Sequence, residues 1–430
     1  MITFVDASHH TLSGLSSDAT GGILAAYTWA SAVSCLIAPY IFKLHHTKLL
    51  VLISAGVFSL ASIAYSFIFM VPNGWVKWVA IVVRAVMGCS GGFVGNFICS
   101  SLLMIYSRRI GMISGLINMA CDLGFLVAPL VGPFFYNRIG FEMTQLSAAS
   151  VITAVLIWVV IAPEFDHPEA VNIPTESEGA SWLSAYIKIF KCFPLMFLLL
   201  SPFINQITVC LPTAFLGTLL HDTFNLSSNY TGYVFIGMGL AYASVTPIMA
   251  YLSDIPRFNH FIAILFSPIL LSLSLGIISI SRVLTTPLTF IQVLVGYTAS
   301  GLASGVGNGP IWGAMIRAWA YQYPNSADQT AFLTSIYLLT YPLGNAIGTT
   351  VGGFLYERMG FVTIIEVQVG LLALYSVVML GFTLTYGRWI QREWNQNQNS
   401  LNVAVQIQSE ETVSMDGLDT DEAPIPWTTI

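Results

Sequence analysis

The chain is built from long apolar segments with almost no charge, and this feature restricts it to a lipid environment. Each segment is close to the roughly 20 residues that a helix needs to cross a bilayer, and charged residues or Pro/Gly turns separate the segments. Only 8% of the residues are charged, against roughly 25% in a soluble domain. The sequence therefore predicts an all-α, multi-pass membrane protein with eleven transmembrane helices embedded in the bilayer. The expected spans lie near residues 21–43, 48–71, 78–106, 110–135, 144–162, 192–219, 230–252, 260–281, 287–316, 330–353 and 362–386.

A ten-residue string occurs twice and divides the chain into two similar halves. Residues 132–141 read GPFFYNRIGF and residues 352–361 read GGFLYERMGF. The strings end the fourth and tenth spans, so both copies cross the membrane in the same direction, which is a known arrangement of repeats in transporters. Five spans lie in the first half and six in the second. Either the first helix has been lost, or the sequence starts late.

The spans and the polar stretches between them predict five parts. Lys and Arg residues are more frequent at one end of the spans, which makes that end cytoplasmic. Two sequons, at Asn225 and Asn229, share a loop on the opposite side, where they predict glycosylation. The parts are a luminal or extracellular segment (1–20), a five-helix bundle (21–163), a cytoplasmic linker (164–190), a six-helix bundle (191–386) and a disordered cytoplasmic tail (387–430).

Polar groups at membrane depth are costly, so they are the first place to look for function. Asp122 lies midway along its predicted span, and Asn118 is one turn earlier on the same helical face. Asp122 could pair with a cationic substrate or carry a coupling proton, or it could be a hydrogen-bonded packing residue. Arg84 is the base inside a predicted span, and it could neutralise Asp122 or bind backbone carbonyls.

Further residues in the spans are candidates for binding or for movement. Amide and phenol side chains in mid-span either bind a ligand or form hydrogen bonds between helices, as for Asn205, Gln206, Asn308, Tyr341 and Asn345. Glycines and prolines allow helices to approach closely or to bend. The gating and helix-packing candidates are Gly88, Gly92, Gly124, Pro129, Gly132, Gly344 and Gly352.

Several function classes are excluded by the absence of their patterns. The net charge of −6 comes largely from acids in the linker and the tail, so no nucleic-acid partner is expected. The six cysteines show no CxxC spacing, and neither HExxH nor GxSxG occurs. We therefore expect no catalytic residues, no metal site and no cofactor, and we do not expect an enzyme.

Several stretches resemble the major facilitator superfamily. They are Arg84 with the glycines that follow it, the repeated strings, and the loop at Asp254. Residues 224–254 and 351–361 are similar to the vesicular polyamine transporter branch of the vesicular amine transporters. The resemblance implies twelve helices in two bundles, with the first helix missing here. The loop KLHHTK departs from the family pattern, and Asn118, Thr213 and Ala314 stand where the branch is expected to have acids.

The resemblance implies a proton-coupled antiporter that moves a small organic cation, similar to an amine or polyamine, by alternating access. Its partners would be that cation, protons and the bilayer, and we expect a monomer. The resemblance places it in an intracellular vesicle membrane, with the plasma membrane as an alternative. A second interpretation is a truncated or transport-incompetent relative that acts as a binding or regulatory membrane protein.

Overall fold

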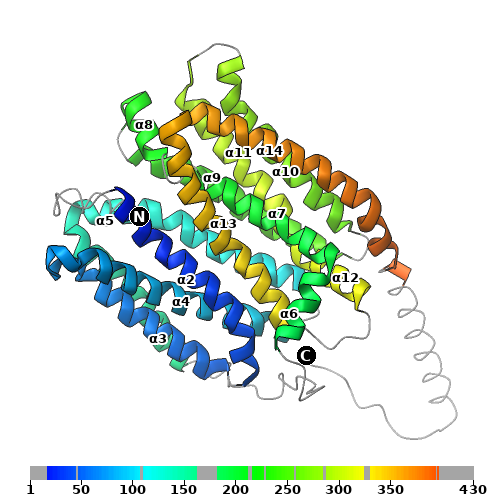
Figure 1. The fold of residues 1–430 in the computed structure, drawn as a ribbon, viewed down its shortest axis with the longest axis horizontal. Coiled ribbons are helices and arrows are strands. Elements are labelled where there is room, and N and C mark those ends of the chain that lie inside the picture. The colour runs from blue at the N-terminus through cyan, green and yellow to red at the C-terminus, as the bar shows by residue number, and fades with distance from the viewer. Residues whose placement is uncertain are drawn as a thin grey trace, which may run out of the picture.

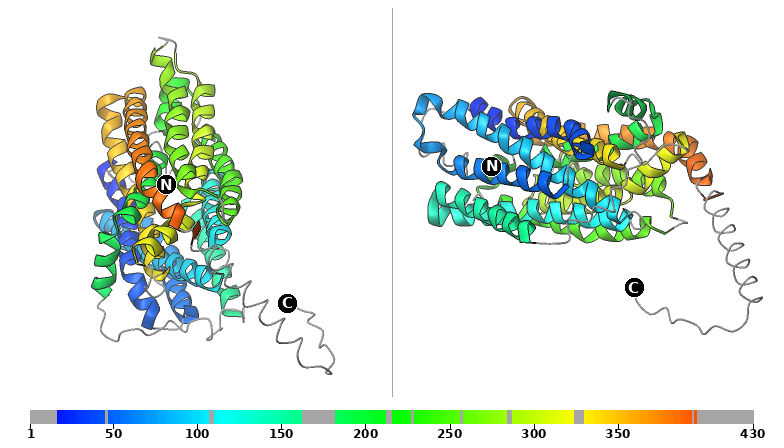
Figure 2. Two further views of the ribbon diagram at one scale, coloured as in Figure 1. Left: turned by 90° about the vertical axis from the view of Figure 1, so that its right-hand side faces the viewer. Right: turned by 90° about the horizontal axis from the view of Figure 1, so that it is seen from below.

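The computed structural model describes residues 17–44, 47–106, 110–161, 182–211, 216–226, 229–255, 258–283, 287–323, 330–393 and 395–396. Within these ranges the secondary structure is helical, with no strand. The long helices run along one direction, as Figure 1 and the right view of Figure 2 show. The first half comprises α2 (Ser17–Leu44), α3 (Thr47–Ser66), α4 (Asn73–Ile105) and α5 (Ile110–Ile161).

The second half contains six long helices and two short ones. The long helices are α7 (Phe193–Cys210), α9 (Asn229–Ser253), α10 (His260–Val283), α11 (Phe290–Asn308), α13 (Thr330–Met359) and α14 (Phe361–Phe382). The short helices are α8 (Leu216–Phe224) and α12 (Ile311–Gln322). Another short helix, α6 (Trp182–Lys191), precedes α7, so the last part of the predicted linker is helical.

Nine of the predicted spans are confirmed as helices long and apolar enough to cross a membrane within the described residues. The other two positions, near 110–135 and 330–353, are helical as well, in α5 and α13. In the span near 110–135, the segment Gly111–Cys121 is a shorter apolar helix. Many side chains in the rest of this span lie outside the described residues. Helix α13 is rich in Thr, Ser, Tyr and Gly, which lowers its mean hydropathy. Side chains such as Leu60, Leu273 and Val377 are more than 60% exposed, as is expected for surfaces that face lipid.

The repeated string forms the same turn in both halves. Gly140 has φ 76° and Gly360 has φ 72°, a left-handed backbone conformation that glycine adopts without the penalty that other residues incur. At Gly140 the turn joins the two arms of α5, and at Gly360 it joins α13 to α14. The two expected spans near 110–135 and 144–162 are therefore the two arms of α5.

The end of the last span extends beyond its predicted boundary. After α14 a π-helical turn, Thr383–Gly387, leads into helix that continues to Glu393. Ile390 is 1% exposed and belongs to the core of the second half. The residues up to 393 are therefore part of the last helix rather than of the predicted tail, because Ile390 is buried in this core and Gln391 accepts a hydrogen bond from Arg317 of α12 over 2.9 Å.

The two halves meet along two pairs of helices, α5 with α9 and α2 with α13. Within each half the helices pack at glycines in matching places. A Cβ added to Gly88 of α4 would collide with the backbone oxygen of Tyr27 in α2, and one added to Gly301 of α11 would collide with that of Met238 in α9. Direct contact between backbones therefore fixes how each half is assembled.

This contact predicts a clear difference between two glycines of α4. Replacing Gly88 with alanine should force α2 and α4 apart and cost roughly 1–3 kcal/mol of stability. Gly95 has nothing within 4 Å of its added Cβ, so Gly95→Ala should be neutral or stabilise by up to about 1 kcal/mol. Thermal unfolding of the two variants in detergent measures the difference. Equal shifts in the midpoint would contradict the assignment.

Candidate functional site

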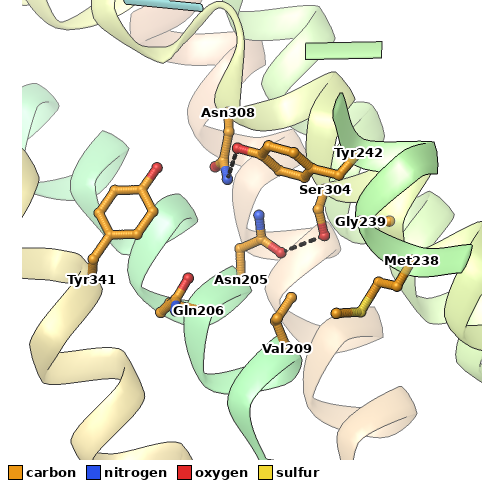
Figure 3. A pocket seen from close by; sticks show the side chains of 10 residues that line it. Asn205, Gln206, Val209, Met238, Gly239, Tyr242, Ser304, Asn308 and Tyr341 are labelled. Atoms are coloured by element: carbon orange, nitrogen blue, oxygen red, sulfur yellow. Dashed lines mark hydrogen bonds between the residues drawn. The ribbon is translucent and has the colours of Figure 1, made fainter. Parts of the chain in front are cut away.

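A narrow polar cavity lies between the C-terminal parts of α7 and α11 and the middle parts of α9 and α13 (Figure 3). Its volume is about 40 Å³, which holds a few water molecules and is far below the roughly 300–1,000 Å³ of a typical ligand pocket. All of its lining side chains are uncharged. They are Asn205, Gln206, Val209, Met238, Tyr242, Ser304, Asn308 and Tyr341, with Gly239 and Gly301 between them.

Hydrogen bonds hold most of these polar groups in place. Ser304 Oγ donates to Asn205 Oδ1 over 2.7 Å, and Asn308 Nδ2 donates to the Tyr242 hydroxyl over 3.2 Å (Figure 3). Asn308 Oδ1 is buried and has no hydrogen-bond partner among the described residues. Because an unsatisfied buried acceptor is costly, this oxygen is ready to accept an N–H or O–H donor from a molecule in the cavity.

Tyr341 connects the cavity to the first half of the chain. Its hydroxyl lies 2.7 Å from the hydroxyl of Tyr337, one turn earlier on α13. Asn118 on α5 donates through Nδ2 to the same Tyr337 hydroxyl over 3.1 Å. A hydrogen-bonded chain therefore runs from the cavity across the boundary between the halves.

Four more hydrogen bonds join the halves, or join the linker helix to the first half. The Asp254 carboxylate, after α9, accepts from the backbone N–H groups of Gly111 (2.9 Å) and Met112 (2.8 Å) at the start of α5. Ser335 Oγ donates to Asn96 Oδ1 over 2.8 Å. The Tyr186 hydroxyl of α6 donates to the backbone oxygen of Leu36 in α2 over 2.6 Å.

These contacts lie near the same end of the molecule, where α5 and α13 begin and α2 and α9 end. We call it the basic end. It carries Lys48, Lys188, Lys191, Arg388 and Arg392. Close packing accompanies the hydrogen bonds, since a Cβ added to Gly111 or Gly115 would collide with side chains at the end of α9. The two halves are therefore packed together between the cavity and the basic end, and this packing closes the path from that end to the cavity.

The structure brings four of the eight candidate binding residues together around the cavity: Asn205, Gln206, Asn308 and Tyr341. Asn118 joins them through Tyr337. Asn345 is half-buried one turn beyond Tyr341, and its backbone oxygen accepts from Thr349. The backbone of Asp122 is helical, and its side chain lies outside the described residues.

Arg84 lies apart from the cavity, within the first half. Its guanidinium carbon is 4.5 Å from the centroid of the Tyr65 ring, a cation–π arrangement. Its Nε is buried and has no hydrogen-bond partner among the described residues. The expected pairing of Arg84 with Asp122 stays a prediction, because the carboxylate is not described.

Four of the seven predicted packing residues lie against a neighbouring helix. Gly88 and Gly92 lie against α2, while Gly344 and Gly352 lie against α7. Gly124 has nothing within 4 Å of an added Cβ. Gly132 is half-buried, and the side chain of Pro129 lies outside the described residues.

The two predicted glycosylation residues lie at the end of α8 and at the start of α9. Asn225 is exposed with φ 52° just after α8. Asn229 is the first residue of α9, and its side chain lies outside the described residues.

Sequence reasoning missed Tyr242, Ser304 and Tyr337. Each lies in a helix where small or aromatic residues occupy every face, so no periodic pattern separates it from its neighbours. Ser304 sits inside the glycine-rich stretch of α11, and its role becomes visible only through its bond to Asn205.

The family model of the Major Facilitator Superfamily matches residues 3–302, more than half of the chain. The chain belongs to the Major Facilitator Superfamily. The expected superfamily, its helical fold and the multi-pass membrane location are confirmed. The pairing of α5 with α9 and of α2 with α13 is then the boundary between the two bundles of a superfamily member.

Curated relatives carry the name MFS-type transporter SLC18B1. The human protein is 26% identical over 315 residues, which cover 70% of this chain and 64% of the human protein. The mouse protein is 23% identical over 312 residues, which cover 70% of this chain and 64% of the mouse protein. The match thus spans somewhat less than two thirds of the relatives' length.

Two solved structures show the same fold. The human organic anion transporter MFSD10 aligns with a TM-score of 0.60 at 17% identity, over 84% of this chain and 83% of its own. The proton:xylose symporter XylE, bound to 6-bromo-6-deoxy-D-glucose, aligns with a TM-score of 0.63 at 12% identity, over 88% and 91% of the two chains. All of these proteins are named as transporters and none as an enzyme.

Proposed function

We propose that the chain is a secondary active transporter that exchanges a small organic cation, similar to an amine or polyamine, for protons by alternating access. The observation that carries this proposal is the small polar cavity with its hydrogen-bonded connection to the boundary between the halves. Superfamily membership and the SLC18B1 relatives support the transporter class.

The geometry supports alternating access because the cavity is too small for an amine in this conformation. The halves must separate before a substrate can enter, and the bonds at the basic end must then break. A ligand lowers the free energy of one conformation relative to the other only if the ligand makes different contacts in the two conformations. In the proposed mechanism the bond from Asn118 to Tyr337 is a contact that differs between them, since it joins the halves, and Tyr341 connects it to the cavity.

The lining suits a protonated amine in part. Asn308 Oδ1 can accept an ammonium N–H, and the rings of Tyr242 and Tyr341 can stabilise a cation through their faces. The described lining supplies no negative charge. In the proposed mechanism Asp122, one helical turn after Asn118 on α5, supplies that charge and exchanges its proton for the substrate.

The direct test is uptake of labelled monoamines and polyamines by proteoliposomes under an imposed pH gradient. We expect accumulation that a protonophore abolishes and that Asp122→Asn uncouples from pH. Glu366→Gln is the control, since this carboxylate pairs with Arg282 (2.9 Å) at the opposite end. Unaltered pH dependence in Asp122→Asn would remove the coupling role. Absence of uptake for every organic cation, with the protein folded, would leave the binding or regulatory alternative.

The cavity itself predicts a selective effect on substrate affinity. Asn308→Ala removes the free acceptor and the bond to Tyr242 without adding side-chain volume to the cavity. Loss of one neutral hydrogen bond of about 1 kcal/mol should raise the apparent KM about fivefold. Ser300→Ala on the same helix is the control, because among the described residues its hydroxyl bonds only to the backbone oxygen of Tyr297. Equal KM values for the two variants would argue against Asn308 as a ligand contact.

A further inference from the structure

The linker helix α6 and the end of the last span form one continuous surface at the basic end. The rings of Phe193 and Tyr386 lie 5.5 Å apart, and those of Phe197 and Phe382 stack at 4.3 Å. These aromatic contacts join the α6–α7 junction to the end of α14. We call the exposed residues around them the interface patch, defined as Lys188, Phe190, Lys191, Arg388, Trp389 and Arg392.

Helix α6 has one buried face and one exposed face. Tyr186, Ile189 and Cys192 recur at every third position and are at most 6% exposed. The opposite face presents Phe190, which is 54% exposed, and the two exposed lysines Lys188 and Lys191. Figure 1 shows α6 running across the direction of α7 rather than along it. A short helix with this composition and direction fits the plane of a membrane interface.

The depth of the patch follows from the length of the last span. Phe361–Glu393 comprises 33 residues, about 50 Å of helix, whereas the hydrocarbon core is about 30 Å thick. Tyr386 and Trp389 therefore lie near the level at which aromatic side chains gather at membrane interfaces. Phe193, the first residue of the α7 span, packs against Tyr386 and fixes α6 at the same level.

The charge of the patch selects its partner. Four bases, Lys188, Lys191, Arg388 and Arg392, lie within it, and among the residues that the structure describes the adjacent exposed acid is Glu393. The exposed aromatic side chains need an apolar environment next to these positive charges. A leaflet that contains anionic lipid offers both, because its acyl chains lie directly beneath negatively charged headgroups.

We propose that the interface patch binds the anionic headgroups of the leaflet at the basic end. The lysines of α6 contact the headgroups, and Phe190 and Trp389 enter the acyl boundary. Helix α6 also contacts both halves, through the bond from Tyr186 to Leu36 and the packing of Tyr186 on Phe332. The lipid is therefore bound next to the segment that joins the halves.

The test compares anionic and neutral lipid on the purified full chain. Phosphatidylserine or phosphatidylcholine is titrated into detergent micelles while the midpoint of thermal unfolding is measured. We expect phosphatidylserine to raise the midpoint at lower concentration. A basic residue near an anionic membrane surface contributes about 1 kcal/mol, or about fivefold, so Lys188→Gln with Lys191→Gln should weaken the apparent affinity about 25-fold.

Three controls make the outcome decisive. Lys77→Gln with Arg138→Gln removes the same charge at the opposite end and should keep the response, as should Lys188→Arg with Lys191→Arg. Inorganic phosphate, added as the free anion, should not reproduce the shift. Equal responses to the two lipids, an equal loss in the Lys77 and Arg138 control, or full reproduction by phosphate would each overturn the proposal.

Discussion

Tyr337→Phe is expected to lower the transport rate about 30-fold while leaving the protein folded. The substitution removes the hydroxyl that accepts from Asn118 and bonds to Tyr341, and it keeps the ring that packs 5.1 Å from Trp312. Tyr337 is 1% exposed, so the Asn118 amide loses its bond in a dry environment. A buried polar group left unsatisfied costs about 1–3 kcal/mol, and 2 kcal/mol corresponds to about 30-fold.

In the proposed mechanism the rate falls because the bond joins the halves in only one of the two states. Initial uptake rates in proteoliposomes measure the effect. Tyr375→Phe is the matched control, because the hydroxyl of this buried tyrosine bonds to Met379 over 3.9 Å and to Ser201 of α7, which both lie in the second half. If Tyr337→Phe transports as fast as Tyr375→Phe, the hydrogen-bonded chain has no part in coupling the cavity to the boundary.

Asp254→Asn is expected to open the basic end. The carboxylate of the second half accepts two backbone N–H bonds at the start of α5 in the first half, where the helix dipole adds to the attraction. Hydrogen bonds to a charged group contribute about 1.5–3 kcal/mol each, and the exposure of Asp254 reduces this value. A total loss of about 2 kcal/mol should raise the ratio of open to closed molecules about 30-fold.

Double electron–electron resonance measures the distance between spin labels at Tyr106 and Ile255 and reports this opening. Both positions are exposed at the basic end, one in each half. We expect a population at longer distance in Asp254→Asn and an unchanged distribution in Asp254→Glu, which keeps the charge. An unchanged distribution in Asp254→Asn would show that the packing of α5 on α9 holds the basic end closed without the carboxylate.

The sequence located the cavity residues in part. Asn205, Gln206, Asn308 and Tyr341 stood out because an amide or phenol in an apolar span needs a partner, and the structure places all four on one cavity. Their partners Ser304 and Tyr242 did not stand out, because serine and tyrosine are also ordinary packing residues in membrane helices. Asn118 was predicted from its place one turn before Asp122 on the same helical face, and its bond to Tyr337 of the other half is visible only in the structure.

The sequence by itself determined the environment of the chain, the positions of its helices and its two-fold repeat. A bilayer accepts only segments that satisfy their own backbone hydrogen bonds over about 20 apolar residues, and this requirement is visible in composition alone. Only the tertiary structure decided which polar residues meet. In lipid a helix is apolar on nearly every face, so hydropathy does not fix its rotation. The packing of α5 on α9 and of α2 on α13 set that rotation, and it brought Asn118 to Tyr337 and Asp254 to Gly111.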